Sequence, residues 1–368
     1  MGSGKGFSLR RLVKTGVARA FHSTRADELM GMLAGSKRMP LVVGYHRVVE
    51  DFAAEAQRAM PAMLTSCGML ERHLEWIGRR FRFVSLDELG ERVERGGEFD
   101  GPVAAVTFDD GYRDMYENAF SLLQRKGIPA AVFVVTDLIG TSRVQIYDRL
   151  YLLLEQAFSW RESPRRALGG LLDRLGIRLR EIERMMNGAA NFSTVTRALL
   201  RALPQGEVYR VIEALEAEVE LPEAKLKGLL PLTWEMIEEM HRAGMTIGSH
   251  TRTHALLANE SRERVLDEIA GSRRELERKL GIAIHHLAYP DGRFTAATVR
   301  AVAASGYRFA YTSCTHRDPN DPLLTIPRIL LWENSCLDPS GRFSQAIMSC
   351  HVHGVFNFLG SCGQDHTA

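Results

Sequence analysis

The chain has 368 residues, of which 45% are hydrophobic and 25% are charged, a composition typical of a globular protein with a large buried core. Its formal net charge of +2 gives no global sign of nucleic-acid binding, and the lack of any apolar run of about 18 residues argues against a membrane-spanning helix. The five cysteines contain no CxxC pair, and no apolar core of signal-peptide type follows the basic N-terminus. We therefore expect a cytoplasmic protein.

The pattern of residues 1–39 predicts a basic amphipathic helical segment. Apolar side chains such as Phe7, Leu12 and Val17 recur among arginines and lysines at roughly helical spacing. The favoured interpretation is a helix that packs against the rest of the protein and exposes its basic face. The alternative is peripheral contact with an anionic surface, here the inner face of the membrane.

Strands and helices alternate over residues 40–146 and again over 231–335, which predicts a parallel sheet in one domain. We expect Asp87 to open the second helix and Thr233 to cap the fourth. The expected strands cover residues 40–48, 81–85, 103–108, 130–135, 245–250, 286–289 and 309–312, and the last element covers 324–331. The expected helices cover residues 70–77, 86–93, 118–126, 234–243, 262–280 and 296–305.

Two further segments depart from this alternation. Leucines at helical spacing over residues 147–230 predict an all-helical insertion. Residues 336–368 form a C-terminal tail dotted with cysteines and histidines, which matches no regular element and is a candidate for partial disorder.

The central motif is a short apolar run, residues 103–108, that ends in Asp109 and Asp110. Two adjacent carboxylates beside a buried strand raise each other's pKa unless positive charge lies nearby, so the pattern indicates a metal ion. One carboxylate can bind the ion while the other accepts a proton from water as a general base. The alternative is an acidic pair at a helix N-terminus, stabilised by the helix dipole.

A second motif, His250 and His254, follows another predicted strand. On a helical turn this spacing would bring both imidazoles to one side, close enough to hold one ion. Such a pair is weak evidence alone, because histidines recur at this spacing for structural reasons. In α/β barrels, however, the carboxyl ends of parallel strands share one face, so these residues can converge with Asp109 and Asp110 into a catalytic metal site.

Three sequence runs resemble motifs of the polysaccharide deacetylase family, carbohydrate esterase family 4. They are residues 108–112 (FDDGY), 248–254 (GSHTRTH) and 288–292 (AYPDG), and the run at 45–48 (YHRV) is also similar to many members. The resemblance covers roughly residues 41–331, interrupted by the helical insertion. It implies a distorted (β/α) barrel and hydrolysis of N-acetyl groups on amino sugars such as N-acetylglucosamine.

By motif position, the resemblance implies that Asp109 is the base and that Asp110, His250 and His254 bind a divalent metal, usually Zn²⁺. The backbone amide of Asp291 would help to hold the oxyanion, without a role for its side chain.

Two departures from the family pattern stand out. Ala288 occupies the position where many members have an arginine that orients the base, and Arg328 is a candidate to replace it. The family's late Leu-x-His motif, which supplies a catalytic acid, has no clear counterpart. His351, His353 and His316 are candidates for that role.

The sequence therefore predicts a metal-dependent amidohydrolase that acts on an N-acetylated glycan or a lipid-linked glycan precursor, in carbohydrate metabolism such as exopolysaccharide biosynthesis. One rival is a catalytically silent, metal-holding carbohydrate-binding protein. Another is a deformylase or O-acetyl esterase that uses the same site. The insertion could shape the glycan cleft or bind a partner, and its residues do not distinguish these roles.

Overall fold

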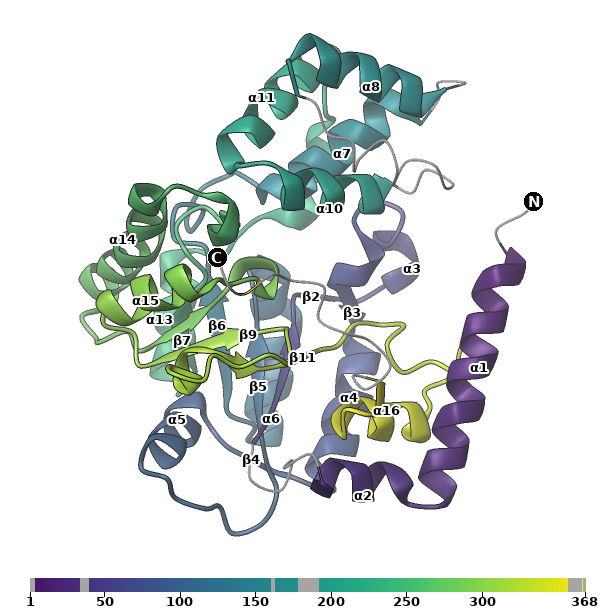
Figure 1. Ribbon diagram of the computed structural model, residues 1–368, viewed down its shortest axis with the longest axis vertical. Coiled ribbons are helices and arrows are strands. Elements are labelled where there is room, and N and C mark those ends of the chain that lie inside the picture. Colours follow the sequence, from purple (N-terminus) through teal and green to yellow (C-terminus); the bar gives the residue numbers. More distant parts are fainter. Residues whose placement is uncertain (1–3, 34–39, 160–162, 178–191, 357–365, 367–368) are drawn as a thin grey trace.

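A sheet of parallel strands forms the centre of the protein (Figure 1). The computed structural model describes residues 4–33, 40–159, 163–177, 192–356 and 366. Within them the strands of the main sheet follow the order β10-β9-β8-β7-β6-β5-β1-β11, with β4 beside β5. These strands are β1 Leu41–Tyr45, β4 Arg82–Phe83, β5 Val103–Phe108, β6 Ala130–Val134, β7 Thr246–Ser249, β8 His286–Ala288, β9 Phe309–Thr312, β10 Ile326–Pro327 and β11 Ile329–Leu330. Their continuous valine- and alanine-rich runs suit a sheet that is covered on both faces.

One short segment joins the two edges of this sheet. β10 pairs with β9 at one edge, β11 pairs with β1 at the other, and only Arg328 separates the two strands. The Arg328 amide donates a hydrogen bond to the carbonyl of Thr312 (2.7 Å), and the Leu331 amide donates to that of Gly44 (2.8 Å). The sheet is thereby nearly closed into a distorted (β/α) barrel, so the predicted fold class is confirmed.

The strand expected over residues 40–48 is interrupted at His46. β1 ends at Tyr45, and β2 Arg47–Val49 pairs with β3 Leu64–Ser66 in a second, small sheet. The buried guanidinium of Arg47 donates a 2.7 Å hydrogen bond to Asp114, which holds β2 outside the barrel. The prediction of one continuous strand was therefore wrong, because a buried ion pair redirects the chain after His46.

Helices cover the outside of the barrel, and most begin where the local sequence supplies a cap. The side chain of Thr233 accepts a hydrogen bond from the Met236 amide, as predicted. Ser85, and not Asp87, caps α5, because Asp87 instead accepts hydrogen bonds from Thr246 and His286. The helices are α4 Cys67–Gly78, α5 Leu86–Glu94, α6 Ser121–Lys126, α13 Trp234–Arg242, α14 Arg262–Leu280 and α15 Ala296–Ala304, and a π-helical segment, Met115–Phe120, precedes α6.

A helical unit lies between β6 and β7 and occupies the top of Figure 1, in teal. It consists of α7 Ile146–Phe158, α8 Pro164–Arg174, α10 Phe192–Ala202, α11 Gln205–Glu216 and α12 Glu223–Leu226. Buried leucines and valines at helical spacing give the unit a hydrophobic core of its own. The described part of the interval 147–230 is thus helical, as its leucine pattern predicts; residues 160–162 and 178–191 lie outside the description.

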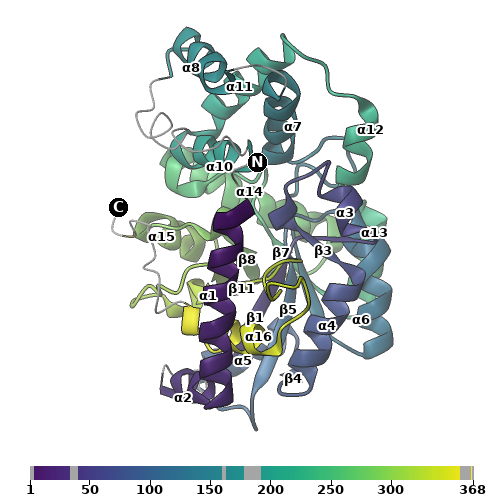
Figure 2. The same ribbon diagram turned by 90° about the vertical axis from the view of Figure 1, so that its right-hand side faces the viewer.

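The first and last described helices pack against each other (Figure 2). α1 Gly4–Ser23 and α2 Ala26–Leu33 form the N-terminal segment, and α16 Gln345–Val352 lies against both. The prediction of an irregular C-terminal tail was wrong for α16, because Ser344 caps this helix and Ile347 and Met348 are fully buried. Among the described helices, none has the length and hydropathy needed to cross a membrane.

Candidate active site

A cavity opens at the carboxyl ends of the barrel strands, between the barrel and the helical unit. It encloses about 840 Å³, counting its open mouth. Three strands contribute polar residues to its lining: His46 follows β1, Asp109 and Asp110 follow β5, and His250 follows β7. Asp291, in the loop after β8, also lines the cavity. The predicted convergence at one face of the barrel is therefore present in the structure.

Asp110, His250 and His254 form a compact cluster of ligand atoms, all within 4.8 Å of one another. The Nε2 atoms of His250 and His254 lie 3.5 Å and 3.3 Å from the same oxygen of Asp110, Oδ1. His250 donates a hydrogen bond from Nδ1 to the carbonyl of Ala288 (2.7 Å), which leaves its Nε2 with a free lone pair directed at the cluster.

The state of these three residues fits a bound cation. Asp110 is 1% exposed, and its Oδ1 has no hydrogen-bond donor among the described residues. Burial and the neighbouring Asp109 raise the pKa of Asp110 well above its usual range, so its charged form needs a positive partner. Burial also lowers the pKa of both histidines, which favours the neutral imidazoles that metals bind. The donor set of two imidazoles and one carboxylate is one that zinc accepts.

The loop that carries the two histidines differs from the helical turn expected from their spacing. Residues 250–254 form no helix, and Thr251 and His254 have positive φ angles of 67° and 60°. The two imidazoles meet nonetheless, with ring centroids 4.9 Å apart. The prediction of proximity was right, but its physical reason was wrong, because a loop with two left-handed residues brings the rings together.

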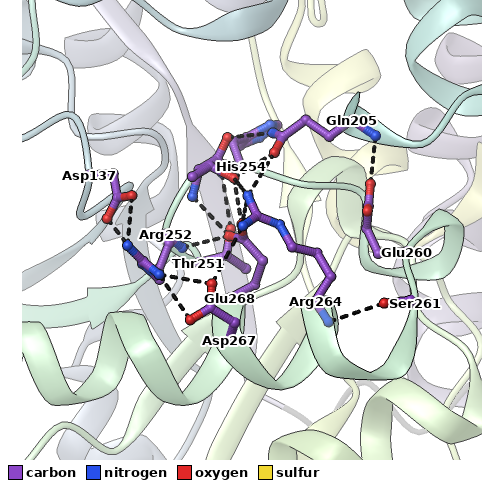
Figure 3. Close-up of polar contacts among 11 residues, drawn as sticks. Asp137, Gln205, Thr251, Arg252, His254, Glu260, Ser261, Arg264, Asp267 and Glu268 are labelled. Carbon is purple, nitrogen blue, oxygen red and sulfur yellow. Dashed lines mark hydrogen bonds and ion pairs between the residues drawn. The ribbon is translucent and has the colours of Figure 1, made fainter. Parts of the chain in front are cut away.

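A hydrogen-bond network from two other elements holds this loop in place (Figure 3). The buried carboxylate of Glu268, on α14, accepts hydrogen bonds from the amides of Arg252 (2.9 Å) and Thr253 (2.8 Å). Gln205, the first residue of α11, donates from Nε2 to the Thr253 carbonyl (2.8 Å) and accepts from the Thr253 hydroxyl (2.7 Å). The helical unit therefore supports the turn between the two histidines directly.

Asp109 and Arg328 form a buried, two-pronged ion pair. Nη1 and Nη2 of Arg328 donate to Oδ1 and Oδ2 of Asp109, each at 2.7 Å, and Nη1 also donates to the hydroxyl of Thr107 (3.0 Å). Burial would raise the pKa of Asp109, but the charge and hydrogen bonds of Arg328 bring it to about 2. Arg328, the candidate to replace the motif arginine, thus contacts Asp109 directly.

The first helix of the helical unit contributes Tyr147 to the site, which sequence reasoning missed. The Tyr147 hydroxyl donates a 2.7 Å hydrogen bond to Oδ2 of Asp110, and its ring packs edge-on against His254 at 5.1 Å. Gln145, just before α7, donates to the carbonyl of Asp110 (3.0 Å). Because these contacts join residues more than 30 positions apart, no local pattern in the sequence could reveal them.

Asp291 lies in a tight turn that borders the cavity. Its φ angle is 52°, and Gly292 follows with a φ of 64°. A Cβ atom at Gly292 would lie 2.0 Å from Oγ and 2.5 Å from the backbone nitrogen of Ser313, so only glycine fits there. The Asp291 carboxylate accepts two hydrogen bonds from Arg201 on α10, at 2.7 Å and 3.1 Å. The side chain therefore ties the turn to the helical unit.

The histidines proposed as catalytic acids lie away from the cavity lining. His351 contacts Lys14 and the carbonyl of Ser335, and His316 stacks on Phe294. His353 lies against Ser349. None of these three candidates for the catalytic acid belongs to the described cavity lining.

His46 is instead the third histidine of the described cavity lining. Its Nε2 lies 4.0 Å from Oδ2 of Asp110. Burial is the main cause that lowers the pKa of His46, to about 4, so the ring is neutral at neutral pH. Its place after a strand, in the run at 45–48, was the sequence signal that could have identified it.

Comparisons with known proteins agree with this fold and motif set. A family model described as polysaccharide deacetylase matches residues 96–162 and 187–310, together more than half of the chain. The poly-β-1,6-N-acetyl-D-glucosamine N-deacetylase of Staphylococcus epidermidis is 26% identical over 144 residues. That alignment covers 37% of this chain and 50% of the relative, so it spans only half of the relative's length.

Two solved structures share the fold. The deacetylase PplD of Streptococcus pyogenes, in complex with acetate, aligns with a TM-score of 0.52 and 18% identity, over 82% of this chain and 95% of its own. IcaB of Ammonifex degensii also aligns with a TM-score of 0.52, at 17% identity, over 86% of this chain and 97% of its own. At these identities the likeness concerns the fold.

Proposed function

The chain belongs to the polysaccharide deacetylase family, and from this premise we propose that it is a metal-dependent hydrolase that removes N-acetyl groups from an amino-sugar-containing glycan. The observation that carries the proposal is the pairing of two different aspartates in one cavity. Asp110 faces two imidazoles, whereas Asp109 is held by Arg328. A ligand set and a separate oriented base are what hydrolysis of an acetamide requires.

We assign Asp110, His250 and His254 as the metal ligands, with Zn²⁺ as the proposed ion. When bound there, the ion would polarise the acyl carbonyl and acidify a water molecule. Asp109, kept ionised by Arg328, accepts the proton of the attacking water. The backbone amide of Asp291 donates to the oxygen that becomes negative during the attack.

The amino-sugar nitrogen must gain a proton before the C–N bond breaks. Two groups of the cavity lining can deliver it: Asp109, after it has taken the proton of the water, and His46. We propose that His46, a cavity histidine outside the three assigned metal ligands, delivers it. Because His46 is neutral at rest, it first takes the proton that Asp109 has accepted from the water and then passes that proton to the nitrogen. Acetate and a free amine are the products.

A catalytically silent sugar-binding protein is the main rival. Two departures from the family motifs favour this rival: Ala288 in place of the usual arginine, and the missing late histidine. Arg328 on Asp109 and His46 in the cavity each offer a substitute for a missing group, which argues against the rival. A deformylase or an O-acetyl esterase would use the same residues, and only substrate tests separate these activities from deacetylation.

The proposal includes a lipid-linked glycan precursor that the protein meets in the cytoplasm, at the inner face of the membrane. In support, α1 exposes Leu12 (52%) and Val13 (59%), whereas Thr15 and Ala18 of the same helix are buried. Sedimentation with anionic and with neutral vesicles tests this part. Equal recovery in the supernatant with both would remove membrane contact from the proposal.

Acetate release from N-acetylglucosamine oligosaccharides tests the function itself, with and without chelator and added zinc. The β-1,6-linked oligomer is the first substrate, because the S. epidermidis relative is named for that polymer. Asp109→Asn and Asp110→Asn form a matched pair of variants. Asp109→Asn should keep one metal ion per chain but lose about 10²- to 10⁴-fold in kcat, whereas Asp110→Asn should lose both metal and activity. Release that survives the chelator and Asp109→Asn would refute the proposal.

A further inference from the structure

Helix α10 of the helical unit lines one part of the cavity. Ser193, Thr196, Arg197, Leu200 and Arg201 line it, and their spacing of three to four residues places them on one face of the helix. A substrate in the cavity therefore has this face of α10 within reach.

Arg197 has no carboxylate partner in the described cavity lining, unlike the other two arginines there, Arg201 and Arg328. Three carboxylates line the described cavity: Asp109 pairs with Arg328, Asp291 pairs with Arg201, and Asp110 faces the two imidazoles. Arg197 is exposed at the same lining and forms no hydrogen bond or ion pair with any described residue. Its guanidinium thus remains available to a ligand in the cavity.

Thr196, the preceding residue in the sequence, also lines the cavity and carries a second unpartnered donor. Thr196 is fully buried, yet its hydroxyl has no hydrogen-bond partner among the described residues. A buried hydroxyl left unpaired is unfavourable, so this position favours a ligand with acceptor oxygens. A guanidinium beside a hydroxyl suits the planar or tetrahedral oxygens of a carboxylate or phosphate, which accept charge-assisted hydrogen bonds from arginine.

We infer that Thr196 and Arg197 form a subsite for a negatively charged group of the substrate, a carboxylate or a phosphate, next to the N-acetylated sugar. The inference rests on the proposed function, since it concerns the same cavity. A carboxylate would come from a neighbouring uronic acid, and a phosphate from the link between glycan and carrier. Arg201, one turn further along α10, is not available in the same way, because its charge is already paired with the carboxylate of Asp291.

The test compares kcat/KM for three N-acetylglucosamine substrates: a neutral disaccharide, a disaccharide with glucuronic acid, and the 1-phosphate. The unmodified protein should prefer at least one charged substrate. Arg197→Gln should lower the ratio of charged over neutral kcat/KM by about 10- to 100-fold, the usual effect of losing a hydrogen bond between charged groups. High salt should lower the same ratio. Preference for glucuronate identifies a uronic acid as the source, and preference for the phosphate identifies the carrier link.

Arg166→Gln is the matched control, because it makes the same charge change on an exposed residue of α8 away from the cavity lining. It should leave the ratio unchanged. If no substrate releases acetate, the proposed function fails, and the subsite is then tested by calorimetric binding of glucuronate and of inorganic phosphate to the unmodified protein and to Arg197→Gln. Equal use of neutral and charged substrates, or equal binding by the two proteins, would overturn the inference.

Discussion

Arg328 donates two parallel 2.7 Å hydrogen bonds to Asp109 across 219 positions of sequence. Replacing it by lysine keeps the charge but removes the planar fork. We expect Arg328→Lys to lower kcat by roughly 10²-fold with little change in KM, because the base loses its fixed orientation. Steady-state kinetics measure this effect. An unchanged kcat would show that charge alone is enough to place Asp109.

Arg328→Gln removes the positive charge beside Asp109, and the pH dependence of kcat/KM tests what that charge does. Burial would raise the pKa of Asp109, but the charge and hydrogen bonds of Arg328 lower this pKa to about 2. Without that charge the pKa rises, by about one to three units. A general base works only when it is ionised, so the acidic limb of the kcat/KM profile should move to higher pH. A profile that keeps its acidic limb in Arg328→Gln would contradict the assignment of Asp109 as the base.

Tyr147→Phe tests whether the helical unit helps to hold the metal. The change removes the hydrogen bond to Asp110 but keeps the ring against His254. Loss of such a supporting contact typically lowers metal affinity by about 10- to 100-fold. Competition with a chelator of known affinity measures it. Tyr209→Phe, an exposed tyrosine on α11, is the control, and equal affinities in the two variants would exclude the role of Tyr147.

His46→Ala separates the two routes by which the leaving nitrogen gains its proton. If His46 delivers the proton, kcat should fall by about 10²- to 10⁴-fold while one metal ion per chain is retained. The fall should be smaller for a substrate with a better leaving group, such as an aryl acetamide. Full activity in His46→Ala would assign the delivery to Asp109 alone.

Gly292→Ala tests the turn that presents the Asp291 amide. The added methyl group would meet Ser313, which should cost about 1–3 kcal/mol of unfolding free energy and displace the turn, with a fall in kcat. Adding Ser313→Ala removes the hydroxyl contact but not the backbone contact at 2.5 Å, so recovery should be incomplete. Gly281→Ala, at a similar φ with open space around it, controls for backbone strain. A full recovery in the double variant would show that the backbone contact is harmless.

The sequence predicts features that depend on neighbouring residues. The boundaries of α14 and the Thr233 cap follow from local periodicity and capping chemistry, and both are found. His250 and His254 were expected to meet on a helical turn and instead meet in a loop, because Glu268 and Gln205 hold that loop. Such supports come from distant helices, and neither residue carries a local signal that would have indicated the contact.

The same distinction explains the candidate catalytic acids. A late histidine was sought near the C-terminus, where the family motif lies, but His46 reaches the cavity from the first barrel strand. Position along the chain is a poor guide in a closed sheet, because the first and last strands are neighbours. The paired aspartates were easier to identify, since their adjacency is itself unusual after a buried strand.

The closure of the sheet by residues 326–330 also sets an order of events during synthesis. Asp110, His250 and His254 leave the ribosome before Arg328, and β10 and β11 cannot dock until both edges of the sheet exist. A nascent chain therefore contains the Asp110, His250 and His254 cluster before it contains the guanidinium that contacts Asp109. A chain that ends before Arg328 lacks both this contact and the segment that closes the sheet.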